Sequence, residues 1–260
     1  MAPFAMCPDC EREYTAPTNR RFHAQPVACP VCGPKVWLET GSNDFSRLAT
    51  EVATTENAIH KTRALLAKGK IIAIKGLGGF HLACDATDVQ SVTELRNRKL
   101  RVDKPFALIM PDLETIEKHC FVSESERELL LSTARPIVLL KRKPESNIAK
   151  EVAPAQDWLG VMLPYTPLHY LLLEKAKGFP EALVMTSGNI SEEPIATDND
   201  EARTRLASLA DGFLFHNRDI HIRCDDSVAR IFEDNRQSSI VNRKSEIYPI
   251  RRSRGYSPFP

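Results

Sequence analysis

Four cysteines near the N-terminus have the spacing of a metal site. Two residues separate Cys7 from Cys10 and Cys29 from Cys32, and eighteen residues lie between the two pairs. A two-residue gap lets two thiolates bind one ion from a tight turn, and two such pairs complete a tetrahedron of sulfurs around zinc. A redox dithiol generally occurs once, beside a βαβ unit. We therefore predict a structural zinc site, in which the intervening His23 is not needed as a ligand.

A run of cations between Arg96 and Lys104 is the second chemical feature. Five Lys and Arg residues occur within nine positions there, a density that alone is typical of a solvated helix end. The run leads, however, through Pro105 into the apolar segment 106–110. This order places Lys104 at the mouth of a predicted sheet, where open α/β folds bind their ligands.

Residues 75–81, KGLGGFH, follow a predicted strand and contain a glycine-rich turn. Glycines let backbone N–H groups approach an anion closely, and Lys75 adds a positive charge. The turn lacks both the G-K-[ST] of a P-loop and the third glycine of a dinucleotide-binding fingerprint. On its own it is consistent either with an anion-binding loop or with a plain tight turn.

Small polar residues and further cations occur in three later segments: TSGN at 186–189, RCDDS at 223–227 and RRSRGY at 251–256. Hydroxyl and amide groups can hydrogen-bond phosphate or ribose, and a glycine allows close approach. The sequence has no Ser in a G-x-S-x-G elbow and no convincing nucleophile triad. Cations and hydroxyls without a covalent nucleophile suit phosphoryl or nucleotidyl transfer, in which positioning and charge stabilisation dominate.

Strands that alternate with helices are expected to position these groups. We predict helices ending near Gly69, spanning Val89 to Leu95, and at 112–119, 123–132, 167–175 and 198–209. We predict strands at 71–75, 106–110, 136–141, 159–164, 182–188 and 212–216, with two or three β segments between 227 and 250. The pattern indicates an open α/β sheet that becomes mixed near the C-terminus.

The first forty residues differ from the rest, since they contain four cysteines, six prolines and little helical periodicity. Such a segment is too short to bury a hydrophobic core of its own and needs a cross-link, such as a bound metal ion, to fold. We therefore predict a zinc finger at 1–40, a linker at 41–55 and a nucleotide-binding domain at 56–260.

Bulk charge does not point to nucleic acid or a membrane. Lys and Arg number 35 against 34 Asp and Glu, a net charge of +1. The last twenty-five residues are nevertheless basic, so an anion site is expected to draw on that end. No apolar run approaches the roughly 20 residues that span a bilayer, and no signal peptide is evident. Together with the clustered cysteines, this favours the cytoplasm.

Motifs along nearly the whole chain resemble the hydrogenase maturation carbamoyltransferases of the HypF family. KGLGGFHLACDA, RKLRVDKPFA, TSGNISEEPI, HNRDIHIRCDDSV and RRSRGYSP resemble, in the same order, the YrdC-like domain of that family. MCPDC, NRRFHAQP and CPVCGP resemble the second of its two zinc fingers. The resemblance implies an open, twisted, mixed α/β sheet with helices. Family members are longer, with an acylphosphatase domain, another finger and a carbamoyl-transfer domain, so this chain is expected to be a piece of a larger enzyme or a natural short protein.

The resemblance also implies a reaction. Carbamoyl phosphate supplies carbamate, ATP with Mg²⁺ activates it as carbamoyl-adenylate, and another domain passes the carbamoyl group to a cysteine of a hydrogenase maturation protein. The cations expected at phosphate and carbamate are Lys75, Lys99, Arg101 and Lys104. The residues expected around the nucleotide are Ser187, Asn189, Arg223, Asp226, Ser227 and Arg254.

Two other functions remain open at this stage. Free-standing YrdC-like proteins make threonylcarbamoyl-adenylate for tRNA modification, although the zinc finger and the GLGGFHL loop are more like HypF. A non-enzymatic module that binds double-stranded RNA is also conceivable from the zinc knuckles and the basic C-terminal end. The near-zero net charge argues against it, because phosphate-driven binding generally needs a strongly basic face.

Overall fold

The computed structural model describes residues 4–25, 27–40, 54–190, 193–232 and 246–257. Most of the predicted linker at 41–55 lies outside these residues. So do Arg236, Arg243 and Lys244, which contribute to the basic C-terminal end. None of the helices in the described ranges is long and apolar enough to cross a membrane.

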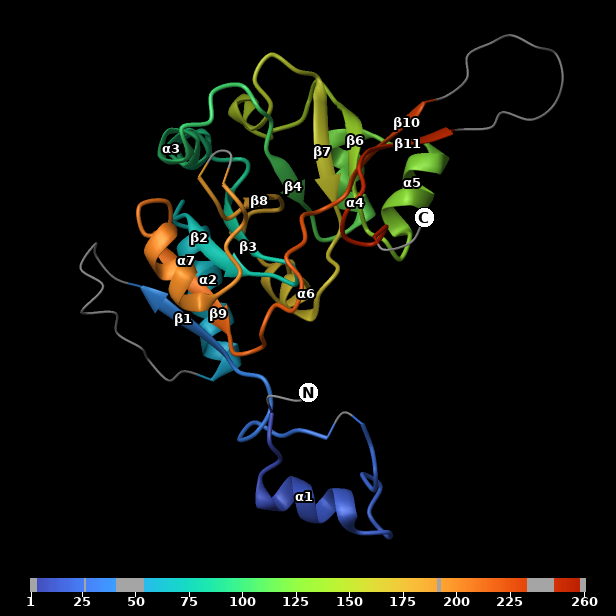
Figure 1. The fold of residues 1–260 in the computed structure, drawn as a ribbon. Coiled ribbons are helices and arrows are strands. Elements are labelled where there is room, and N and C mark those ends of the chain that lie inside the picture. The colour runs from blue at the N-terminus through green and yellow to red at the C-terminus, as the bar shows by residue number, and fades with distance from the viewer. Residues whose placement is uncertain (1–3, 26, 41–53, 191–192, 233–245, 258–260) are drawn as a thin grey trace, which may run out of the picture.

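One mixed sheet runs through the molecule (Figure 1). Its strands lie in the order β1-β9-β2-β3-β8-β4-β7-β6-β10-β11, and β5 pairs with β6 outside this path. The pairs β2–β9, β4–β7 and β6–β10 are parallel, and the remaining pairs are antiparallel. The strands are β1 (Val36–Thr40), β2 (Ile72–Lys75), β3 (Phe80–Asp85), β4 (Ala107–Ile109), β5 (Cys120–Phe121), β6 (Ile137–Arg142), β7 (Trp158–Met162), β8 (Leu183–Ser187), β9 (Gly212–His216), β10 (Val228–Phe232) and β11 (Glu246–Arg251).

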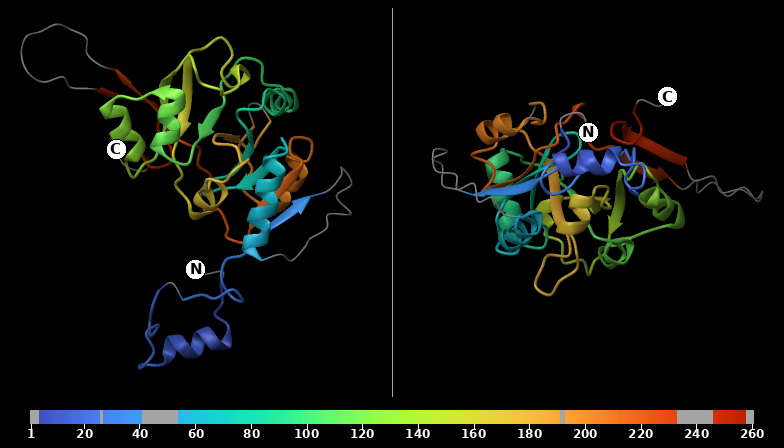
Figure 2. Two further views of the ribbon diagram at one scale, coloured as in Figure 1. Left: turned by 180° about the vertical axis from the view of Figure 1, so that it is seen from behind. Right: turned by 90° about the horizontal axis from the view of Figure 1, so that it is seen from below.

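Helices cover both faces of the sheet, and Figure 2 shows α2 in cyan against one of them. Apolar side chains of α2 and α6 pack in one core cluster, while those of α3, α4, α5 and α7 pack in the other. The helices are α1 (Pro8–Thr15), α2 (Thr55–Leu66), α3 (Val89–Lys99), α4 (Leu113–His119), α5 (Glu124–Leu131), α6 (Pro167–Leu172) and α7 (Asn199–Arg205), with a short 3-10 turn η2 (Lys150–Val152).

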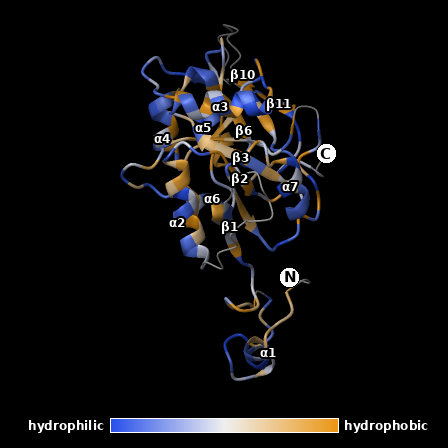
Figure 3. Ribbon diagram, turned by 90° about the vertical axis from the view of Figure 1, so that its left-hand side faces the viewer, coloured by the Kyte–Doolittle hydropathy of each residue, from blue (hydrophilic) through white to orange (hydrophobic). Residues whose placement is uncertain are grey.

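The central strands are apolar on both faces because each face is covered. In β2, Ile72 and Ile74 join one core cluster, whereas Ala73 joins the other. A strand buried on both sides has a continuous apolar sequence rather than an alternating one. Figure 3 shows the same arrangement, with hydrophobic strands inside and helices whose outer faces are hydrophilic.

The cysteine-bearing module lies at one end of the molecule, outside the sheet (Figure 1). The chain enters the sheet from this module through β1, which pairs antiparallel with β9 over five positions, from Val36 opposite His216 to Thr40 opposite Gly212. The amide of Lys35 also donates to Oδ1 of Asn217 at 2.7 Å. The strand Val36–Thr40 is therefore shared between the two parts, and the boundary at residue 40 stays a prediction.

The predicted open mixed sheet is confirmed, but its antiparallel pairs are not confined to the C-terminal end. No strand was predicted directly after the glycine-rich turn in 75–81, whereas β3 begins there at Phe80 and pairs with β2. The hairpin reverses the chain in the middle of the sheet, so β3 lies antiparallel to both β2 and β8. Strand β1 and helix α1 were not predicted, and α6 and α7 are shorter than expected.

Candidate functional site

The four cysteines of the N-terminal module converge on one point. Their Sγ atoms all lie within 4.8 Å of one another. Cys7 and Cys29 are 3.7 Å apart, Cys29 and Cys32 are 3.8 Å apart, and Cys32 and Cys10 are 3.7 Å apart. Tetrahedral zinc with Zn–S bonds of about 2.3 Å requires sulfurs about 3.8 Å apart. The donor set therefore fits structural zinc, with all four positions filled by thiolates.

Local structure brings these thiols together. Cys7 is the N-cap of α1, which places Cys10 on its first turn, and the amide of Gly33 donates to the carbonyl of Cys29 at 2.7 Å in the second knuckle. His23 lies outside the cluster and packs against the rings of Tyr14 and Phe22. Its role in the module is packing, as expected when four cysteines suffice.

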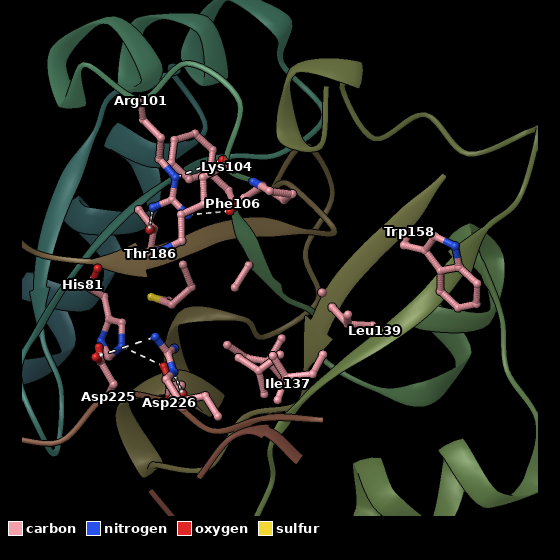
Figure 4. Close-up of a pocket in the computed structure, with 18 of the residues that line it drawn as sticks. His81, Arg101, Lys104, Phe106, Ile137, Leu139, Trp158, Thr186, Asp225 and Asp226 are labelled. Carbon is pink, nitrogen blue, oxygen red and sulfur yellow. Dashed lines mark hydrogen bonds and ion pairs between the residues drawn. The ribbon is translucent and has the colours of Figure 1, made fainter. Parts of the chain in front are cut away.

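A cavity of about 450 Å³ opens on the middle of the sheet (Figure 4). One side is apolar, and the other carries hydroxyls and charges from the ends of β3 and β8 and from the loop after α3. The apolar lining is Pro105, Phe106, Ala107, Ile137, Leu139, Trp158, Gly160, Met185, Val228 and Ile250; the polar lining is His81, Arg101, Lys104, Gln156, Thr186, Ser187, Asp225, Asp226 and Arg251. Such a combination suits a ligand with a flat apolar part and an anionic part.

The loop between α3 and β4 presents two predicted cations, Arg101 and Lys104, to this cavity. The guanidinium of Arg101 donates from Nε to the carbonyl of Lys104 at 2.9 Å, from Nη2 to the carbonyl of Pro105 at 2.5 Å and from Nη1 to Oγ1 of Thr186 at 3.3 Å. Burial, followed by repulsion from nearby arginines, lowers its pKa to about 10. Arg101 therefore stays charged at neutral pH while held in one orientation.

Lys99 lies behind the cavity and is not among the described residues that line it. Its ammonium donates to the carbonyls of Ser187 and Asn189 at 2.8 and 2.6 Å and to Oδ1 of Asn189 at 3.2 Å. Burial, and then the charges of Arg101 and Lys104, lower its pKa to about 7. In this structure Lys99 holds the 187–189 turn in place.

Lys75 also lies away from the described cavity lining. Its ammonium donates to the carbonyl of His216 at 3.2 Å, at the end of the neighbouring strand β9, and burial lowers its pKa. The turn that follows is tight, with the amide of Gly76 donating to the carbonyl of Gly79 at 2.9 Å. In this structure the 75–81 segment thus forms a tight turn between two strands of the sheet.

A buried ionic cluster forms the base of the cavity. Asp226 accepts from Nε2 of His81 at 3.0 Å and from Nε of Arg254 at 2.7 Å. These two partners hold the pKa of its carboxyl well below the usual range, although burial opposes them. The guanidinium of Arg254 also donates to the carbonyls of Ala134 and Arg135 and lies over the ring of Tyr165.

Two further predicted residues, Ser227 and Arg254, support this cluster but are not among the described residues that line the cavity. Ser227 is fully buried, donates to the carbonyl of Arg254 at 2.8 Å and accepts from the amide of Ser253 at 2.7 Å. Both side chains therefore fasten the 253–254 segment to the segment that carries Asp225 and Asp226.

A second, more polar cavity of about 340 Å³ adjoins the first, since both include Asp225 and Arg251 in their lining. Its wall contains the predicted residues Asn189 and Arg223, together with Cys224. Oδ1 of Asn189 accepts from the hydroxyl of Ser187 at 2.8 Å. Cys224 is half-buried, and its Sγ lies 3.2 Å from the hydroxyl oxygen of Ser253.

The structure thus brings Arg101, Lys104, Ser187 and Asp226 to one cavity and Asn189 and Arg223 to its neighbour. Sequence reasoning missed His81 and Arg251 as cavity residues and Tyr165 and Arg96 as supporting residues. Arg251 could have been found from its place in the basic RRSRGY segment. His81 follows the glycine-rich turn, but its pairing with Asp226, 145 positions away, has no local signal.

Comparison with known proteins places this fold and site in a family. A family model described as "Telomere recombination", Sua5_yciO_yrdC, matches residues 64–244, and a model described as "HypF finger" matches residues 6–39. The first match covers more than half of the chain, so the chain belongs to the Sua5/YciO/YrdC family.

Relatives that are similar to both the finger and the domain are HypF proteins. The "Carbamoyltransferase HypF" of Rhodobacter capsulatus is 49% identical over 231 residues, which cover 89% of this chain and 29% of that protein. A crystal structure of full-length HypF in a phosphate- and nucleotide-bound form matches with a TM-score of 0.81 and 48% identity, covering 99% of this chain and 31% of that one. The HypF of T. kodakarensis matches with a TM-score of 0.83 and 43% identity, over 100% and 31%. The resemblance to HypF is confirmed, and the chain spans about a third of the length of these relatives.

Proposed function

We propose that this chain catalyses ATP-dependent formation of carbamoyl-adenylate, as one step of carbamoyl transfer in the maturation of nickel–iron hydrogenase. The observation that carries the proposal is the cavity that joins an apolar wall to Arg101, Lys104, Thr186 and Ser187. An apolar wall suits a purine base, and cations with hydroxyls suit phosphates. The phosphate and nucleotide named for the homologous HypF crystal structure support the same ligand class here.

The reaction needs charge neutralisation more than proton transfer. An oxygen of carbamate forms a bond to the α-phosphorus of ATP, and the bond from that phosphorus to the bridging oxygen breaks, so that pyrophosphate leaves with Mg²⁺. Because the attacking oxygen is already anionic, no general base is required. Arg101 and Lys104 stabilise the charge that develops, and the bonds that fix Arg101 mean that it need not reorganise during the step.

The remaining predicted residues fall into two groups. Ser187 and Asn189 are proposed to contact phosphate or ribose, and Arg223 is proposed to contact an anionic part of a ligand from the second cavity. Lys75, Lys99, Ser227 and Arg254 bond mainly to backbone carbonyls, and we propose that they act by holding the segments that carry the contact residues. Asp226 lines the cavity and anchors its base.

The chain is proposed to act as part of a larger cytoplasmic enzyme. Other parts would supply carbamate from carbamoyl phosphate and pass the carbamoyl group to a hydrogenase maturation protein, in keeping with relatives about three times as long. The zinc finger carries no open coordination position and is proposed to be structural.

ATP–pyrophosphate exchange tests the proposal. The 260-residue chain is incubated with ATP, Mg²⁺, labelled pyrophosphate and ammonium bicarbonate, which equilibrates with carbamate. We expect exchange that requires both ammonium and bicarbonate. Lys104→Ala should lower kcat/KM about 10- to 100-fold, the effect of losing one charge-assisted contact worth about 1.5–3 kcal/mol.

Lys118→Ala is the matched control, because Lys118 is an exposed lysine that pairs loosely with Glu181 at 3.8 Å, outside the described cavity lining. Full exchange by Lys104→Ala would show that the site is misplaced. Exchange that depends on threonine with bicarbonate would assign the threonylcarbamoyl reaction instead, and a wild-type chain without exchange would contradict the proposed function.

A further inference from the structure

Arg96 is a buried arginine whose guanidinium is surrounded by backbone carbonyls rather than by carboxylates in hydrogen-bonding contact. Only 8% of the residue is exposed. Its Nη1 donates to the carbonyls of Arg101 and Val102 at 3.0 Å each, and its Nη2 donates to those of Lys104 and Val152 at 3.3 and 3.2 Å. Its Nε donates to the carbonyl of Glu151. One side chain thus satisfies five acceptors.

These acceptors belong to two segments, the 101–104 loop beside the cavity and the turn η2 behind it, which is not part of the described lining. Three are in the 101–104 loop, which carries the cavity cations Arg101 and Lys104. Two are in or beside the turn η2, whose Val152 carbonyl also accepts from the amide of Phe106 at 2.8 Å. Arg96 therefore links the loop to the turn that supports the start of β4.

The loop needs such support because its backbone is strained. Leu100, the C-cap residue directly after α3, has a φ of 51°, a left-handed conformation that costs a non-glycine residue about 1–2 kcal/mol. Leu100 is 77% exposed, so packing of its own side chain does little to hold it there. The strain persists because neighbouring contacts determine the conformation, and the Arg96 bonds begin at the next residue.

The same guanidinium also fixes the orientation of Arg101. Lys104's carbonyl accepts both from Nη2 of Arg96 and from Nε of Arg101. Both guanidinium groups lie over the ring of Phe106, at 4.7 Å for Arg96 and 4.9 Å for Arg101, and Phe106 itself lines the cavity. A change at residue 96 would therefore reach Arg101 through a shared acceptor and a shared ring.

We propose that Arg96 is a positioning residue for adenylation: its forked guanidinium sets the 101–104 loop so that Arg101 and Lys104 face the anionic part of the nucleotide. This role rests on the proposed function. It needs the planar fork rather than the charge alone, because a lysine ammonium offers only three donors from a single point and cannot reach acceptors on both segments in the same way.

The test compares Arg96→Lys with the matched control Arg98→Lys. Arg98 lies on the same helix and is also partly buried, but it donates to the carboxylates of Glu94 and Asp211 at 2.7 and 3.0 Å, away from the loop. We expect Arg96→Lys to lower kcat/KM for ATP in pyrophosphate exchange by about 10-fold or more, and Arg98→Lys to change it less than 3-fold.

Two measurements report how well the 101–104 loop is ordered without depending on catalytic activity. Trypsin can cleave after Lys99 and Arg101, whereas Pro105 blocks cleavage after Lys104. A loosened loop in Arg96→Lys should therefore be cut at least several-fold faster than in wild type or in Arg98→Lys. Exchange of the backbone amide hydrogens of residues 101–104 and of Phe106 should speed up in the same variant. Arg96→Gln provides a second variant, and circular dichroism with thermal unfolding identifies the variants that retain the fold.

The outcomes distinguish the two proposals. Faster cleavage of the loop together with weaker exchange activity supports the positioning role. If trypsin cuts Arg96→Lys faster but the wild-type chain shows no pyrophosphate exchange, the adenylation proposal is contradicted, whereas the conclusion that Arg96 orders the loop still stands. A folded Arg96→Lys protein with wild-type loop protection and wild-type kinetics would overturn the positioning role.

Discussion

Nε of Arg254 donates to Oδ1 of Asp226 at 2.7 Å, and this contact joins segments 28 positions apart at the base of the cavity. His81 binds the other carboxylate oxygen from β3. The carboxylate of Asp226 is thus shared by two cationic or hydrogen-bonding partners in a site where only 6% of the residue is exposed. An arrangement of this kind tolerates the loss of one member badly, because the others remain buried without compensation.

We therefore expect Asp226→Asn to lower the free energy of unfolding by about 3–5 kcal/mol. Chemical denaturation with intrinsic tryptophan fluorescence measures this. Asp225→Asn is the matched control for stability, because the neighbouring carboxylate is 43% exposed and lies 3.7 Å from Arg251. Its effect should stay within about 1 kcal/mol. Equal effects of the two substitutions would contradict the special position of Asp226.

Acid should weaken the wild type more than Asp226→Asn. The pKa of Asp226 is depressed below its ordinary value of 3.8, so its contribution to stability is fully present above that value. It is lost as pH falls further, towards the lower pKa of the folded state, because protonation removes the charge that His81 and Arg254 bind. Unfolding measured between pH 5 and 2.5 should show a shallower pH dependence in the variant. Parallel curves would argue against this interpretation.

The lowered pKa of Lys99 predicts that stability also depends on pH at neutral to alkaline pH, here through a basic group instead of a carboxyl group. Burial lowers its pKa from 10.5 to about 7, so between these values the unfolded chain holds a proton that the folded chain has released. Stability should consequently rise with pH across this window, by up to about 1.4 kcal/mol per pH unit from this group. Lys99→Met should remove that slope in denaturant unfolding from pH 7 to 10. A slope unchanged by the substitution would exclude Lys99 as its source.

The four-cysteine cluster predicts one zinc ion per chain. Cys10→Ser should lose the ion and loosen the N-terminal module, since a structural zinc site and the fold of its finger form together. Native mass spectrometry after gentle purification measures the stoichiometry, and Cys224→Ser should keep one zinc because Cys224 lies outside the cluster. A wild-type chain purified without zinc would refute the site.

Close packing of the glycine-rich turn predicts that Gly78 cannot be enlarged. A Cβ at residue 78 would overlap the carbonyl oxygen of Cys224 and lie 2.8 Å from its Cβ, while the Cys224 amide donates to the Gly78 carbonyl at 3.0 Å. Gly78→Ala should destabilise the protein by about 1–3 kcal/mol, the usual cost of overpacking. Leu77→Ala, at an adjacent residue that is 50% exposed, should cost less than 1 kcal/mol by the same measurement.

The sequence allowed prediction of those features that depend on local pattern. The predicted apolar runs became strands, and the paired cysteines converge as their spacing requires. The site was less predictable where burial decides a side chain's role. Arg96, Lys99, Arg101 and Lys104 are all cations of one short run. Arg96, Lys99 and Arg101 each bond to backbone carbonyls, yet only Arg101 and Lys104 of the four line the described cavity. Arg96 and Lys99 are buried because they donate to carbonyls at 151–152 and 187–189, respectively. These acceptors lie far away in the sequence, so the local pattern cannot reveal the contacts.

Strand β1 has a second consequence, for the behaviour of the protein in solution. It occupies the outer side of β9, whose Phe213, Leu214 and Phe215 form an apolar segment that would otherwise be the edge of the sheet. Open apolar edges recruit strands from other molecules, and natural proteins cover them. The cysteine module is continuous with the covering strand, so we expect loss of zinc from the module to weaken the pairing of β1 with β9 as well. Removal of zinc would then first be seen as concentration-dependent self-association, before the nucleotide domain itself unfolds.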